Sequence, residues 1–161
     1  MKRLGAMLRA LFRHPLEVAV CTILVALVAV TFSQVVFRYV LEASLSWSEE
    51  LARFLLMWLA ALSTAYAMKT GAHFALHFVV DRTPPAMRRL IGSAVAFSAS
   101  AFLAVFAYQS LRFAIEVHDM LAPATRMSMA VPYSSAFVGS TLTLYYVLVN
   151  WGRELREQGR E

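Results

Sequence analysis

Four long stretches of apolar residues, separated by short polar segments, dominate the pattern along the chain. Each stretch is close to the roughly 20 residues that an α-helix needs to cross the hydrocarbon core of a bilayer. We place the spans at about 16–37, 47–69, 90–111 and 134–151. The pattern therefore predicts an all-α membrane protein, in which residues 1–161 form a single domain of four transmembrane helices with short amphipathic surface segments.

The basic N-terminus followed by an apolar run imitates a secretory signal peptide. The uncharged run, however, continues from Val18 through Phe37 with no clear cleavage site, so we interpret it as a retained first span. The basic segment 7–14 is expected to lie as a short amphipathic helix on the membrane surface, and Pro15 suits the first turn of the span.

The second span needs a charged first turn, because its uncharged part, residues 54–68, is too short to cross a bilayer alone. Ser46 and Glu49 have the spacing of a capping box, which predicts a helix over 47–69. Acidic residues in the first turn interact favourably with the helix dipole, and Glu49 forms an i,i+4 pair with Arg53.

Lys and Arg are divided unequally between the two sides of this topology. Eleven of the 15 lie in the N-terminal segment, the connection 69–89 and the C-terminal tail, and the other four lie in the remaining two connections. Positively charged segments are retained in the cytoplasm. We therefore expect a multi-pass protein of a bacterial inner membrane with both termini cytoplasmic.

Composition agrees with a lipid environment and excludes several other classes. The chain is 60% hydrophobic and only 16% charged, far below the charged share of a soluble domain. The net charge of +5 comes from residues that flank apolar segments, so no nucleic-acid partner is expected. The single cysteine, Cys21, excludes an intramolecular disulfide and a thiol cluster for a metal.

Candidate catalytic chemistry is absent from the predicted spans, which carry no ionisable residue between their ends, so we expect no enzyme and no catalytic residue. Glu17 near the start of the first span is interpreted as structural. His73 and His77 have metal-ligand spacing, but only Asp81 stands nearby, so no metal site is predicted. All four histidines lie at span ends, which disfavours haem between the spans.

Polar and aromatic residues cluster where the first two spans meet the outer surface. Gln34 and Arg38 share one helical face, and a stripe of large apolar residues follows the second helix. The cluster is open to two main interpretations, a membrane-interface anchor or a docking surface for a partner subunit, and direct substrate binding is a third. The stripe consists of Trp47, Leu51, Phe54, Trp58 and Leu62.

Small residues recur on the last two spans and predict close helix packing within a four-helix bundle. They are Gly92, Ala96, Ser100 and Ala104 on the third span, and Gly139 and Thr143 on the fourth.

The motifs of the outer cluster resemble the signature of a known family. Gln34-Val-Val-Phe-Arg38-Tyr39, then Trp47-Ser-Glu49-Glu50-Leu-Ala-Arg53 and Trp58, is similar to the Q-x-x-x-R-Y and W-x-E-E-x-A-R pattern of the small membrane subunit of tripartite ATP-independent periplasmic (TRAP) transporters. Gly71-Ala-His73 and the segment from Val131-Pro132-Tyr133 to Gly139 resemble further parts of the family pattern, whereas His77 departs from it.

The resemblance implies a non-catalytic scaffold subunit in a three-part system. A periplasmic solute-binding protein would capture an organic anion, and a large permease subunit would import it with sodium. The implied partners are that large subunit, the binding protein and membrane lipids. No cofactor is expected in this chain, sodium belongs to the large subunit, and a bound phospholipid is compatible with the site.

The resemblance also implies a partner interface, although two rival functions stay open. One rival is the membrane anchor of an oxidoreductase, which would bind haem or quinone. The other is a self-sufficient four-span transporter, which would carry a central acidic residue. The interface is expected to consist of Gln34, Arg38, Tyr39, Trp47, Glu49, Glu50, Arg53, Phe54 and Trp58.

Overall fold

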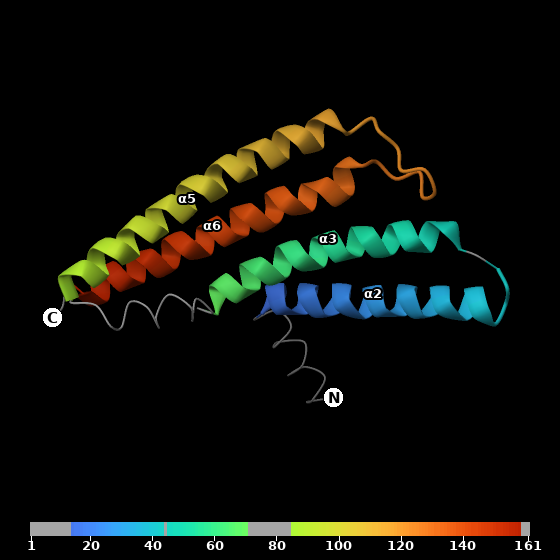
Figure 1. Ribbon diagram of the computed structural model, residues 1–161, viewed down its shortest axis with the longest axis horizontal. Coiled ribbons are helices and arrows are strands. Elements are labelled where there is room, and N and C mark those ends of the chain that lie inside the picture. Colours follow the sequence, from blue (N-terminus) through green and yellow to red (C-terminus); the bar gives the residue numbers. More distant parts are fainter. Residues whose placement is uncertain (1–13, 44, 71–84, 159–161) are drawn as a thin grey trace, which may run out of the picture.

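A computed structural model describes residues 14–43, 45–70 and 85–158, which form four long helices (Figure 1). The connection that holds His73 and His77, and nearly all of the basic segment 7–14, lie outside the described residues. The prediction of an all-helical chain is confirmed. The helices are α2 (Pro15–Tyr39), α3 (Ser46–Lys69), α5 (Pro85–Glu116) and α6 (Ala130–Gln158).

Three of the helices are long and apolar enough to cross a membrane by length and composition. They are α2, α3 and the part of α5 from Leu90 to Glu116. The fourth predicted span, within α6, is not among them.

The predicted capping box at the start of α3 is wrong. Ser46 is the first helical residue, the N-cap is Leu45, and no side chain makes a cap hydrogen bond. Instead, the hydroxyl of the buried Ser48 donates to the Leu45 carbonyl at 2.7 Å. Ser46 is therefore one position too far inside the helix to act as a cap.

Helices α5 and α6 extend beyond the predicted spans of 90–111 and 134–151. The apolar pattern marks only the part of a helix that would lie in lipid. Backbone hydrogen bonds continue through the polar residues at the helix ends, because a helix satisfies its own backbone in water as well as in lipid. The connection between the two helices is correspondingly short.

The four helices lie side by side in a single layer, in the order α2, α3, α6, α5 (Figure 1). In the described part of the chain each helix contacts only its neighbours in this order, so the arrangement is an open layer and not the expected bundle. Helix α2 lies at one edge and contributes no buried residue.

The two central helices, α3 and α6, approach each other closely at one glycine. Gly139 of α6 lies so close to Ala61 of α3 that a Cβ atom at this glycine would be 2.7 Å from the Ala61 Cβ and 2.9 Å from its carbonyl oxygen. Thr143, one turn further along, is also buried, and its hydroxyl donates to the Gly139 carbonyl at 2.7 Å.

Packing along α5 differs from the expected stripe of small residues. A Cβ atom added at Gly92 would meet nothing within 4 Å, and Ala104 is exposed, while Ala96 and Ser100 are partly buried. The buried positions of α5 are instead Ala107 and Ala114, seven residues apart. A four-residue spacing drifts around the helix by about 40° per step, whereas a seven-residue spacing drifts by about 20°, so the latter follows one neighbouring helix for longer.

Candidate partner interface at the hairpin end

The connection between α5 and α6 folds as a compact hairpin, residues 120–129, at one end of the layer (Figure 1). The Met129 N–H donates to the Met120 carbonyl at 2.9 Å, and the Ala122 N–H donates to the Met127 carbonyl at 2.8 Å. Arg126 adopts the left-handed backbone conformation, with φ of 58°. We call this end of the layer the hairpin end, and the opposite one the Lys69 end.

Glu50, just after the first turn of α3, holds the tip of this hairpin. The backbone N–H groups of Ala124 and Thr125 both donate to its carboxylate, at N···O distances of 3.0 and 2.7 Å. The Glu50 side chain belongs to a residue only 9% exposed, so these bonds form in a largely desolvated place. A buried carboxylate needs such donors, because an uncompensated one is very costly.

Phe54 and Trp58 continue the same face of α3, one and two turns further on. Phe54 is buried, and the Trp58 indole N–H donates to the Val131 carbonyl at 3.2 Å, at the start of α6. Residues at i, i+4 and i+8 lie on one side of a helix. Glu50, Phe54 and Trp58 therefore serve the internal contact of α3 with the hairpin and α6.

Most other residues of the predicted interface are exposed at the hairpin end. Glu49 and Arg53 form an exposed i,i+4 ion pair at 3.7 Å on a different face of α3 from Glu50. Arg38 and Tyr39 lie exposed at the end of α2, and among the described residues Arg38 makes no ion pair. Trp47 is also exposed, and Gln34 is half-buried.

The structure thus divides the nine predicted interface residues into two groups. Three of them hold parts of this chain together, and the rest, apart from the half-buried Gln34, remain exposed to a partner or to lipid. The exposed group is Arg38, Tyr39, Trp47, Glu49 and Arg53.

Sequence reasoning missed the hairpin residues that complete this site, Ala124 and Thr125. They act through backbone N–H groups, and side-chain identity carries little information about a backbone donor. Pro123 in this connection indicates a turn, but nothing in the sequence pairs that turn with Glu50.

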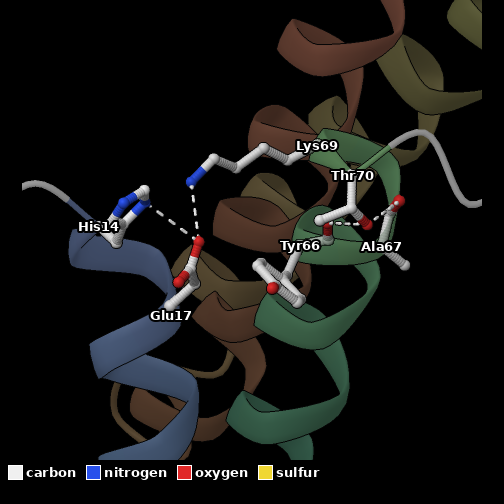
Figure 2. Close-up of polar contacts among 6 residues, drawn as sticks. All are labelled: His14, Glu17, Tyr66, Ala67, Lys69 and Thr70. Atoms are coloured by element: carbon white, nitrogen blue, oxygen red, sulfur yellow. Dashed lines mark hydrogen bonds and ion pairs between the residues drawn. The ribbon is translucent and has the colours of Figure 1, made fainter.

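A second polar cluster joins α2 to α3 at the Lys69 end (Figure 2). The Lys69 ammonium lies 3.5 Å from Glu17 Oε1, and the His14 Nδ1 lies 3.2 Å from the same oxygen. The Thr70 hydroxyl closes the end of α3 by donating to the carbonyls of Tyr66 and Ala67 (Figure 2). Glu17 thus forms an ion pair between two helices, in keeping with the structural role expected for it.

Comparison with known proteins identifies the family of the chain. Residues 27–157 match the family described as tripartite ATP-independent periplasmic transporters, DctQ component. The chain belongs to this family. The match covers the second half of α2, all of α3, α5 and the hairpin, and nearly all of α6, so the resemblance of the outer motifs is confirmed as a TRAP transporter small permease component.

Individual relatives of this DctQ component agree with the family. The sialic acid TRAP transporter small permease protein SiaQ of Vibrio cholerae is 34% identical over 82 residues, which cover 51% of this chain and 47% of the relative. A Haemophilus influenzae protein provisionally named a TRAP transporter small permease protein is 33% identical over 70 residues, 44% of each chain. The chain spans less than half of the length of these two relatives.

A longer alignment reaches a Haemophilus influenzae protein with the same provisional name. It is 20% identical over 134 residues, which cover 83% of this chain and 81% of the relative. The family consists of transporter subunits, and three helices here are apolar enough to span, which makes the chain a multi-pass inner-membrane protein.

Proposed function

We propose that this TRAP small permease component is a non-catalytic scaffold. It holds a large permease subunit that imports an organic carboxylate together with sodium, after a periplasmic binding protein has captured the substrate. Sodium binds the large subunit in this proposal, and phospholipid fills the exposed apolar faces that no subunit covers.

The observation that carries the proposal is the single layer of helices. A path for an ion or a polar solute needs a polar space enclosed between helices, and a layer one helix thick in the described part of the chain encloses none. The middle parts of the helices also carry no Asp, Glu, Lys, Arg or His, which transport pathways usually place there. Such a layer is suited to extending a frame, while a partner carries the substrate.

All four helices span the membrane in this proposal, including α6. Polar hydroxyl groups lower the hydropathy of α6, but each of them donates to a carbonyl of its own helix, which reduces the cost of placing it in lipid. The hydroxyl groups belong to Ser134, Ser135, Ser140, Thr141 and Thr143.

Both termini are proposed to be cytoplasmic. The Glu17–Lys69 ion pair puts the start of α2 beside the end of α3, and the Asn150 side-chain amide, which donates to the Met68 carbonyl at 3.0 Å, puts the end of α6 there too. The Lys69 end therefore holds the helix ends to which the segments richest in Lys and Arg are attached in the sequence, and such segments stay in the cytoplasm. The hairpin end then faces the periplasm.

The exposed residues at the hairpin end are proposed to contact the large subunit. Arg38 and Glu49 offer opposite charges from adjacent helices, and Trp47 adds an aromatic side chain of the kind enriched at membrane interfaces and protein contacts. The substrate class has support from the Vibrio cholerae relative, whose name gives an organic acid, sialic acid.

Co-purification and uptake test this function together. We expect tagged wild-type chain to retain the large subunit through purification in mild detergent, and R38A or E49Q to lower its yield several-fold because each removes an exposed charge at the contact. Full uptake of labelled organic acids, with sialic acid as the first probe, should require a sodium gradient and all three components.

Two outcomes contradict the proposal. Unchanged yield of the large subunit with both variants would show that the large subunit does not dock at the hairpin end. Uptake by this chain reconstituted alone would show that it forms its own path and is not a scaffold.

A further inference from the structure

Glu50 is the most unusual charged group in the described part of the chain, because it is buried without a cationic partner. Among the described residues, the carboxylates that form ion pairs are those of Glu17, Glu49 and Asp119, whereas the Glu50 carboxylate accepts two backbone N–H groups. Hydrogen bonds to a charged acceptor are roughly twice as strong as neutral ones.

The two donors lie 74 and 75 residues from Glu50 along the chain. The contact therefore joins the start of α3 to the connection between α5 and α6, which lies at the same end of the layer (Figure 1). A buried ionic group adds little net stability compared with apolar packing, but it fixes one arrangement, since any other leaves the charge without donors.

The hairpin is internally complete without Glu50. Its own backbone bonds join Ala122 to Met127 and Met120 to Met129, and the Ser128 hydroxyl donates to the His118 carbonyl at 2.6 Å. The tip could therefore swing as a unit if the bonds to Glu50 were absent. Apolar side chains on this unit are exposed, so its position decides where they are presented; they are Met120, Leu121 and Met127.

We propose that Glu50 is a positioning residue, whose buried carboxylate fastens the hairpin tip to the N-terminal part of α3 and makes the two connections at the hairpin end one rigid surface. A surface that is already ordered loses less conformational entropy when it binds a partner. Glu49, the adjacent carboxylate, points to another face and leaves this fastening untouched.

Amide hydrogen exchange of the full-length chain in lipid nanodiscs tests the proposal, read at single-amide resolution. In the wild type, the Ala124 and Thr125 N–H groups should be protected although they lie at a loop tip. E50Q keeps the shape but removes the charge, and E50A removes the acceptor. We expect exchange at these two amides to rise about ten-fold or more in E50A, and by less in E50Q.

The internal amides of the hairpin, on Ala122 and Met129, should keep their wild-type exchange rates in both variants. E49Q is the matched control and should leave all four amides unchanged. Trypsin should also cut after Arg126 several-fold faster in E50A than in the wild type or E49Q.

Three results would overturn the proposal. One is free exchange of the Ala124 and Thr125 amides in the wild-type chain. This test does not depend on whether any variant folds. Another is E50A with wild-type rates at both amides. The third is E50A in which the internal hairpin amides and those of α3 and α6 all accelerate together, since Glu50 would then support the whole fold and not the position of the hairpin. Because the readout uses no transport partner, it can fail independently of the scaffold function.

Discussion

The absence of a Cβ atom at one glycine decides how closely the two central helices approach each other. Gly139 brings α6 against Ala61, and no larger residue fits there without movement. Without a hydrophobic driving force between helices in lipid, such close approach supplies much of the association energy. Gly92 on α5 has the same chemistry and no neighbour within 4 Å of its added Cβ, so the two glycines differ only in surroundings.

Replacing these two glycines with alanine should change the free energy of unfolding by different amounts. G139A places a methyl group 2.7 Å from the Ala61 Cβ, so we expect it to lower the free energy of unfolding by about 1–3 kcal/mol. G92A should leave stability unchanged or raise it by up to about 1 kcal/mol, because alanine favours the helix. Unfolding in mixed detergent micelles, followed by circular dichroism, measures both; equal losses would contradict the close contact.

At the scale of elements, the edge helix α2 is the most weakly attached. Among the described helices it contacts only α3, and it contains no buried residue. The ion pair of Glu17 with Lys69 joins the two helices at the Lys69 end (Figure 2). Both side chains of this pair are partly exposed, at 38% and 29%. A partly exposed pair orients a helix more than it stabilises one.

Charge reversal tests this tie between the two helices. E17K and K69E should each lower the free energy of unfolding by under about 1 kcal/mol, because each places like charges together, and the double variant should recover most of the loss. The cost of each single variant should also shrink as salt is raised, since screening weakens an exposed pair. Simple addition of the two losses in the double variant would show that the pair contributes nothing.

The whole molecule is an open layer whose two ends differ in chemistry. The Lys69 end collects the start of α2 and the ends of α3 and α6, and the opposite end carries the hairpin and the exposed ion pair. An asymmetric layer of this kind has one preferred orientation in a membrane.

Cysteine labelling should reveal that orientation. In a C21S background, we expect A124C at the hairpin tip to react with a membrane-impermeant maleimide in spheroplasts, whereas R156C near the end of α6 should react only after lysis. Both positions are exposed, so the label reports sidedness and not burial. Labelling of R156C but not of A124C in intact spheroplasts would show that the chain has the opposite orientation. Labelling of both would show that α6 does not span the membrane.

The sequence by itself determined the helices, their approximate bounds and the family. Apolar runs of spanning length are local patterns, and the motif from Trp47 to Arg53 is contiguous, so neither needs a fold to be read. It also identified Glu49 with Arg53 as a pair, because i,i+4 neighbours meet on any helix.

Only the tertiary structure decided what the neighbouring residues do. Glu49 and Glu50 are indistinguishable by type and sit side by side in the chain, yet one is exposed in an ion pair and the other is buried against the hairpin. The tertiary structure also decided the order of the helices in the layer, and that Gly139 lies against a neighbouring helix whereas Gly92 does not. Successive residues on a helix point about 100° apart, so their surroundings depend on which helices lie beside them, and that is fixed by contacts between residues distant in the chain.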